Sequence, residues 1–120
     1  DRDFLPENDY NLVYSRFVFH AMPLEEELKT IKKSFELLKM GGNMYIECRS
    51  VGDPLFRKGE LLSKTERVDG HYRRFIVLDE LLDRLQSFGF EIIEAVESNG
   101  LAVYGDDDPV VIRVCAKKID

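Results

Sequence analysis

The sequence contains only two cysteines, and none of its apolar runs approaches the ~20 residues that a membrane span needs. Cys48 and Cys115 lie in separate apolar runs without CxxC spacing, which argues against a zinc site and a disulfide framework and favours buried, reduced thiols. The start of the chain lacks the pattern of a secretory signal. We therefore expect a cytoplasmic protein that does not enter a membrane.

Basic side chains are also in the minority. The 17 Lys and Arg residues stand against 23 Asp and Glu residues, giving a net charge of −6. Neither a nucleic-acid backbone nor an anionic membrane surface is therefore an expected partner. The three carboxylates from Asp106 to Asp108 lack the alternate spacing of a calcium loop and indicate a solvated turn, so no metal site is predicted.

The chain does have enough apolar residues for one folded domain. It is 120 residues long, with 44% hydrophobic and 33% charged residues. That composition is ordinary for a globular protein and too apolar for a disordered one. No linker or internal repeat divides the chain, so we expect a single domain.

Runs of β-prone residues predict four strands, at residues 10–15, 43–49, 90–97 and 109–116. Alternation places Met44, Ile46 and Cys48 on one face of the second strand, and these apolar residues should face the core. Two amphipathic helices are predicted from apolar residues at helical spacing. The first runs from residue 24 to residue 38, with intervals of 4, 3, 4 and 3 residues between its apolar positions, and the pair Gly41-Gly42 is expected to end it. The second begins at residue 78 and ends before Gly89.

The order of these elements predicts an open α/β sheet. The first two strands are joined by a helix and should be parallel, whereas the last two should form an antiparallel hairpin. Residues 50–74 are polar, of mixed charge and only weakly periodic, so they are predicted to be a long loop. A connection of this length is uncommon in a small domain unless it has a function.

Three segments resemble class I S-adenosylmethionine-dependent methyltransferases. The string DYNLVYSRFVFHA at 9–21 resembles the fourth strand of that family and the turn that follows it. The string LLKMGG at 37–42 is similar to the turn between its next helix and its fifth strand, and residues 81–90 with the two strands beyond resemble its last helix and terminal hairpin. Within the family, residues 14–17 and 70–75 look most like bacterial small-molecule or surface-glycan methyltransferases.

The resemblance covers the C-terminal half of that fold. The family's glycine-rich turn after its first strand is missing, because this sequence has no GxGxG-like string. The fold expected is α/β, a Rossmann-like half-sheet of parallel strands with a C-terminal antiparallel β-hairpin and without the fold's N-terminal strands. Residues 1–120 would form one partial domain, with 50–75 as its substrate-side loop, and the chain alone should be inactive.

The resemblance implies S-adenosylmethionine as the cofactor. Ser15, Arg16 and Phe17 are similar in position to residues that flank the methionine end of that cofactor. Asp1 or Asp3 is similar in position to the acid that contacts adenine in that family, and Asp3 is the candidate cofactor-binding residue of the two. For Phe17, packing in the core is the favoured alternative to a ligand contact.

The acceptor site is expected beyond the carboxyl ends of the parallel strands, where open α/β sheets bind ligands. Arg49 follows the second strand, and His20 lies shortly after the first. His20 is equally well explained as a hydrogen-bonded interior histidine. Because guanidinium groups suit carboxylate or phosphate, the arginines at 73–74, with Arg16 and Arg49 nearby, favour an anionic acceptor.

Residues 69–75 contain the densest group of side chains that could act in catalysis or binding. His71 is a candidate catalytic residue, and Tyr72, Arg73 and Arg74 are candidate substrate-binding residues. Adjacent side chains on an extended chain point in opposite directions, so at most one of the two arginines should face the acceptor. The alternative is a solvated loop whose arginines pair with Asp69 or Glu66.

The resulting hypothesis is methyl transfer to a small, anionic or hydroxylated acceptor, with His71 or His20 as the general base. The alternative is a non-catalytic binding or oligomerisation module that uses residues 50–74 as its recognition surface. Strand 10–15 would lie at an apolar edge of the sheet, which predicts a homodimer or strand exchange.

Overall fold

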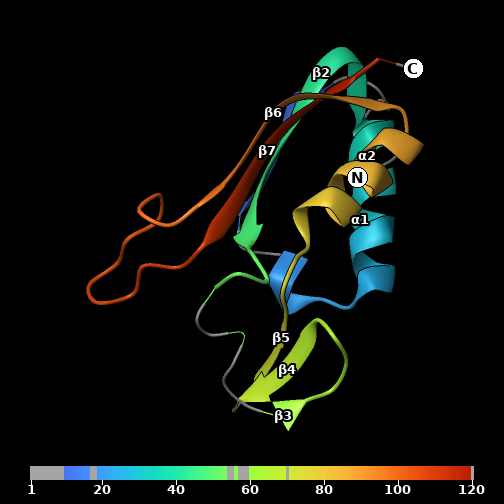
Figure 1. Ribbon diagram of the computed structural model, residues 1–120. Helices are drawn as coiled ribbons and strands as arrows, with labels where there is room; N and C mark the ends of the chain where they lie inside the picture. The colour runs from blue at the N-terminus through green and yellow to red at the C-terminus, as the bar shows by residue number, and fades with distance from the viewer. Residues whose placement is uncertain (1–9, 17–18, 54–55, 57–59, 70, 120) are drawn as a thin grey trace, which may run out of the picture.

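A computed structural model describes residues 10–16, 19–53, 56, 60–69 and 71–119 (Figure 1). Its strands form a larger sheet with helices on one side and a small sheet at one end of the molecule. No helix within the described ranges is long and apolar enough to cross a membrane. The elements are β1 (Tyr10–Arg16), η2 (Phe19–Ala21), α1 (Leu24–Leu37), β2 (Leu38–Arg49), β3 (Glu60–Leu61), β4 (Glu66–Asp69), β5 (His71–Arg74), α2 (Leu78–Ser87), β6 (Phe90–Ser98) and β7 (Val111–Lys118).

The larger sheet has the strand order β1-β2-β7-β6. Strands β1 and β2 are parallel, with Arg16 opposite Glu47 at their carboxyl ends. Strand β7 is antiparallel to both β2 and β6, and β6 and β7 are consecutive in the chain. The predicted fold class is therefore confirmed: a parallel pair of strands, followed by an antiparallel hairpin, in a partial Rossmann-like sheet.

The core lies between this sheet and the two helices, which cover the same face (Figure 1). Ile31 on α1 and Leu81 and Leu85 on α2 are fully buried there. The predicted inward face of β2 is confirmed, because Met44, Ile46 and Cys48 are all buried. Alternate residues of the sheet point the other way, to a face on which Tyr14 and Tyr45 stack with 6.4 Å between ring centroids and are both exposed.

Both cysteines are free thiols in the structure. Cys48 is buried in the core as predicted, and burial raises the pKa of its thiol. Cys115 is only half-buried, because it lies on the open face of β7 beside Tyr45.

The prediction that Gly41-Gly42 ends the first helix is wrong. Helix α1 already ends at Leu37, and Leu38 takes an extended conformation that begins β2. Gly41 has φ +83°, which favours glycine, and a Cβ on Gly42 would lie 2.9 Å from the Lys39 carbonyl oxygen and 3.1 Å from that of Tyr10. The two glycines therefore let β2 pass closely beside β1, at the point where the pairing of these strands shifts register.

The prediction of a loop over residues 50–74 is wrong in part, because the described residues of this segment include β3, β4 and β5. These strands form an antiparallel sheet in the order β3-β4-β5, with Glu66 opposite Arg74 and Asp69 opposite His71. Strands of two to four residues are too short to show an alternating pattern, and most of the residues in these strands are charged or polar.

Candidate functional site

A cleft of about 520 Å³ lies at the carboxyl ends of the parallel strands β1 and β2. Arg16 is the last residue of β1 and Arg49 is the last residue of β2, so the structure brings these two predicted site residues to one place. The other wall is the connection between β6 and β7. The lining residues are Arg16, Arg49, Leu101, Ala102, Val103, Tyr104, Asp107 and Pro109.

Arg49 is held by two carboxylates within this cleft. Its Nη1 donates to Asp53 Oδ2 at 2.7 Å, and its Nη2 donates to Asp107 Oδ2 at 2.9 Å. Burial by itself lowers the pKa of the guanidinium, but the hydrogen bonds to Asp107 and Asp53 outweigh it and hold the pKa of Arg49 above its usual value. Arg49 is therefore a fixed positive charge at the end of β2.

Arg16 is positioned by Glu47, which is itself almost fully buried. The Nε of Arg16 donates to Glu47 Oε1 at 2.8 Å, and the Nε of Arg113 donates to the other oxygen of the same carboxylate. Arg113 also donates to the Leu101 carbonyl oxygen at 2.6 Å. Glu47 thus links the end of β1 to the β6–β7 connection on the far side of the cleft.

Of the other predicted cofactor-binding residues, Ser15 is among those that the structure describes. Its side chain is buried, and its hydroxyl has no hydrogen-bond partner among the described residues. Phe17 and Asp3 lie outside the described residues. The backbone of His20 is part of η2, but its side chain is likewise outside what the structure describes.

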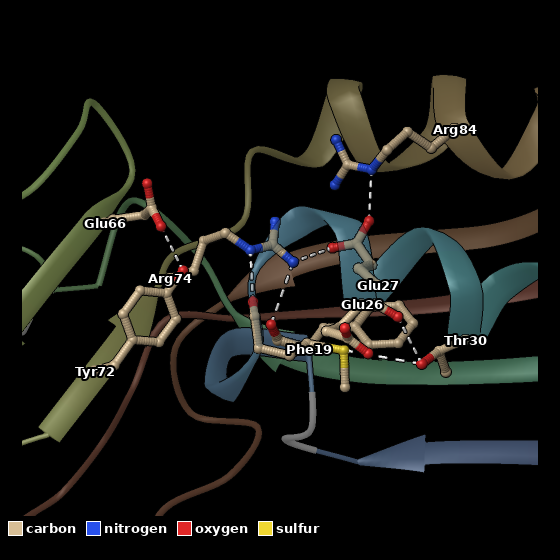
Figure 2. Close-up of polar contacts among 9 residues, drawn as sticks. Phe19, Glu26, Glu27, Thr30, Glu66, Tyr72, Arg74 and Arg84 are labelled. Atoms are coloured by element: carbon tan, nitrogen blue, oxygen red, sulfur yellow. Dashed lines mark hydrogen bonds and ion pairs between the residues drawn. The ribbon is translucent and has the colours of Figure 1, made fainter.

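Arg74 lies in a buried ionic network on the helical side of the molecule, which we call the Glu27 network (Figure 2). Its Nη2 donates to Glu27 Oε1 at 2.5 Å, and the Nε of Arg84 donates to Glu27 Oε2 at the same distance. Arg74 also donates to two backbone carbonyl oxygens, those of Met22 at 2.8 Å and Phe19 at 3.3 Å. These bonds fasten β5 to η2 and to α1.

The Glu27 network corrects the sequence interpretation of Arg74. Neither a substrate-binding role nor a pair with Asp69 or Glu66 matches this geometry, because the guanidinium is buried and bonded to Glu27 on another element. This ion pair could not be predicted from local sequence patterns, since Glu27 and Arg74 are 47 residues apart. Arg73 is half-buried and alternates with Arg74 along β5, so the two side chains leave opposite faces of the small sheet.

Tyr72 is also engaged within the small sheet (Figure 2). Its hydroxyl donates to Glu66 Oε2 at 2.6 Å. Burial first, and then this bond, raise the pKa of Tyr72 to about 12. Hydrogen bonds from Tyr72 and Ser63 lower the pKa of Glu66. The phenol is therefore a protonated donor at neutral pH, while the side chain of His71, at the start of β5, is outside what the structure describes.

The β6–β7 connection is the part of the cleft that sequence reasoning missed. Its carboxylates are not simply solvated, since Asp107 binds Arg49 and Asp108 accepts a hydrogen bond from the Gly100 backbone at 2.7 Å. The available signal was the apolar run from Leu101 to Tyr104 inside an otherwise polar turn. None of the described residues that line the cleft comes from β5, although Ile76, just beyond that strand, donates a backbone hydrogen bond to the Arg49 carbonyl oxygen at 3.0 Å.

Neither a protein-family model nor a curated protein matches this chain. Solved structures do match its fold. A SAM-dependent methyltransferase from Methanosarcina mazei superimposes with a TM-score of 0.73 at 13% identity, over 97% of this chain and 62% of that one. A 1,6-didemethyltoxoflavin-N1-methyltransferase from Burkholderia thailandensis, with bound 1,6-didemethyltoxoflavin and S-adenosylhomocysteine, gives a TM-score of 0.68 at 13% identity, over 96% of this chain and 46% of that one. The cyclase SpnF gives 0.62 at 16% identity, over 95% and 52%.

These likenesses define the class of fold. The chain has the fold of SAM-dependent methyltransferases, and the same strand arrangement also occurs in a cyclase, so the fold does not by itself decide the reaction. The chain spans less than two thirds of the length of each of these three neighbours.

Proposed function

We propose that the protein transfers a methyl group from S-adenosylmethionine to a small acceptor, and that this chain supplies the acceptor side of the site. One observation carries the proposal: a chain with the methyltransferase fold over nearly all its length has an arginine-lined cleft at the carboxyl ends of its parallel strands. Open α/β sheets bind their ligands at that edge. The family type, bacterial small-molecule or surface-glycan methyltransferase, is part of the proposal.

The residues at the end of β1 could form part of the proposed cofactor-binding site. Ser15 offers a buried hydroxyl without a partner among the described residues, and Arg16 stands at the cleft. Phe17 and Asp3 complete the proposed set. S-adenosylmethionine, when bound, supplies an already activated methyl group, so the protein mainly has to bind and orient the acceptor.

Arg49 is the proposed acceptor-binding residue at the cleft. Tyr72 and Arg73 lie on β5, which gives no described residue to the lining of the cleft, so their proposed part in acceptor binding rests on the resemblance alone. His71 or His20 is the proposed general base that removes the acceptor's proton. The elements that carry these two histidines, β5 and η2, are linked by Arg74, which donates to the carbonyl oxygens of Phe19, the first residue of η2, and of Met22, the residue that follows η2.

A titration with S-adenosylhomocysteine tests the proposal. Calorimetry on this chain should show no saturable micromolar binding, because the sequence has no glycine-rich turn for the cofactor. At millimolar ligand, however, backbone amide shifts in NMR spectra should cluster at residues 15–17 and at Arg49. Adenosine is the matched control, since it lacks the amino-acid part and should leave residues 15–17 unshifted.

Either of two results would contradict this assignment. Shifts elsewhere, or none at all, would remove the end of β1 from the cofactor site. Saturable micromolar binding would mean that the chain builds a complete site without the glycine turn.

A non-catalytic oligomerisation module is the second candidate function, and the edge of the sheet favours it. Strand β1 is the last strand of the described sheet on its side, and Tyr10, Leu12 and Tyr14 along it are 40%, 52% and 61% exposed. Unpaired strand edges with apolar side chains tend to pair with another chain. We propose that two copies associate through β1.

Sedimentation velocity at tens of micromolar should therefore show a dimer. Leu12→Lys places a charge on the strand edge and should return the protein to a monomer. Leu62→Lys is the matched control, because Leu62 is similarly exposed, at 54%, but follows β3 of the small sheet. A monomer in the unmodified protein would rule out this association.

A further inference from the structure

The two carboxylates that hold Arg49 differ in how firmly they are fixed. Asp53 is 2% exposed, and its second oxygen accepts a hydrogen bond from the Val110 backbone at 3.4 Å. Asp107 is 48% exposed and lies on the β6–β7 connection. Breaking a buried, doubly bonded ion pair is strongly destabilising, whereas an exposed ion pair contributes little to stability, so Asp107 is the carboxylate that a ligand can displace at lower cost.

Among the described residues, the ion pairs at the cleft contain equal numbers of positive and negative groups. Three arginines, Arg16, Arg49 and Arg113, are bonded to three carboxylates, those of Glu47, Asp53 and Asp107. If Asp107 moves away, Arg49 keeps Asp53 and loses one of its two carboxylate partners, and this group of side chains is left with one net positive charge. The vacated side of the Arg49 guanidinium then has the geometry that binds a carboxylate.

Asp107 belongs to a turn that is closed by its own backbone hydrogen bonds. Tyr104 and Asp107 exchange two backbone hydrogen bonds, of 2.8 and 2.9 Å, around Gly105, whose φ is +58°. This turn also carries exposed apolar surface, because Tyr104 is 86% and Val103 60% exposed. Both side chains line the cleft.

We propose that the cleft binds a small organic monoanion, a carboxylate on an apolar or aromatic body, and that Asp107 is an internal stand-in for the ligand's carboxylate. The ligand displaces Asp107 from Arg49, and the apolar body packs against Leu101, Val103 and Tyr104. A carboxylate is favoured over a phosphate monoester because the ligand replaces one carboxylate, that of Asp107, on Arg49. The proposal rests on the proposed function only in identifying this anion as the methyl acceptor.

NMR titration of the whole chain with benzoate tests the displacement, and benzamide is the neutral ligand of the same shape. Benzoate should bind weakly to the unmodified protein, with shifts at Arg49 and Tyr104, and benzamide should bind less. Asp107→Asn removes the internal competitor and should tighten benzoate binding about fivefold, as expected for the loss of one exposed ion pair. Asp106→Asn is the matched control, because it makes the same charge change at an exposed neighbour and should leave the affinity unchanged.

Arg49→Lys keeps the positive charge but loses the planar fork, so benzoate binding should weaken. Equal effects of Asp107→Asn and Asp106→Asn, or equal binding of benzamide and benzoate, would overturn the proposal. Tighter binding of phenyl phosphate than of benzoate would overturn the choice of a monoanion.

The titrations with benzoate and S-adenosylhomocysteine test the anion site and the methyltransferase assignment separately. Benzoate binding that responds to Asp107→Asn, without cofactor shifts at residues 15–17, would keep the anion site and reject methyl transfer. Cofactor shifts without benzoate binding would keep the methyltransferase assignment and reject the displacement of Asp107.

Discussion

Replacing Glu27 with glutamine is expected to lower the free energy of unfolding by about 3–5 kcal/mol, the usual cost of removing one partner from a buried ion pair. Glu27 is fully buried, and its two carboxylate oxygens accept from Arg74 and Arg84. Glutamine keeps the shape but loses the charge, so two poorly solvated guanidinium groups are left facing an amide. A domain of this kind has a total stability of about 5–15 kcal/mol, so the loss is a large share of it.

Urea unfolding measures this effect, and Glu26→Gln is its matched control. Glu26 is next to Glu27 on the same helix, but its side chain is 55% exposed and it reaches Lys29 only at 3.7 Å. The control should change the free energy of unfolding by no more than ~0.5 kcal/mol. If Glu27→Gln prevents folding, Arg84→Gln provides the milder test, because it leaves the bond between Glu27 and Arg74 in place.

Equal free energies of unfolding for Glu27→Gln and Glu26→Gln would show that the Glu27 network does not form in solution. Hydrogen exchange adds a local measurement. Because Arg74 fastens β5 to η2 and α1, the amides of β4 and β5 should lose protection in Glu27→Gln more than those of β7 do.

The second large effect is expected in the central strand of the larger sheet. Ile112→Ala should lower the free energy of unfolding by about 2–5 kcal/mol, because it removes buried methyl groups and leaves a cavity. Ile112 is fully buried on β7, opposite Cys48 of β2, in the core beneath the helices. Thermal or urea unfolding gives the difference directly.

Ile93→Ala is the matched control for this substitution. Ile93 has the same side chain in the same sheet but lies on β6 at a shift in the strand register, and it is 53% exposed. Ile93→Ala should lower the free energy of unfolding by no more than ~0.5 kcal/mol. A loss comparable to that of Ile112→Ala would contradict the exposure of this residue and would mean that another chain covers the open face of the sheet in solution.

Much of the larger sheet could be predicted from the sequence. The strands and helices of this sheet were predicted from local patterns, such as the alternation of Met44, Ile46 and Cys48 on a half-buried strand. Connectivity then predicted the parallel and antiparallel pairs that are found between β1 and β2 and between β6 and β7. Arg16 and Arg49 were placed at one edge for the same reason, since parallel strands end on the same side of a sheet.

The small sheet and the end of α1 could not be predicted in this way. Strands β3 to β5 are too short to show a period, and they are held by pairing with one another and by the bonds of Arg74 to distant elements. The pair Gly41-Gly42 is typical of a helix end, but the close approach of the Tyr10 carbonyl oxygen is what requires glycine at position 42. Such an approach depends on a neighbour more than thirty residues away and leaves no local pattern.

The sequence by itself therefore determined the class of fold, the inward face of its strands and the edge at which a ligand site should lie, because these depend on local periodicity and chain order. The tertiary structure alone decided which charges meet. Arg74 and Arg49 look alike in the sequence, yet one is buried on Glu27 in the interior and the other stands at the cleft between Asp53 and Asp107. Long-range packing makes that distinction, since the role of a guanidinium depends on which carboxylates lie within hydrogen-bond distance of it.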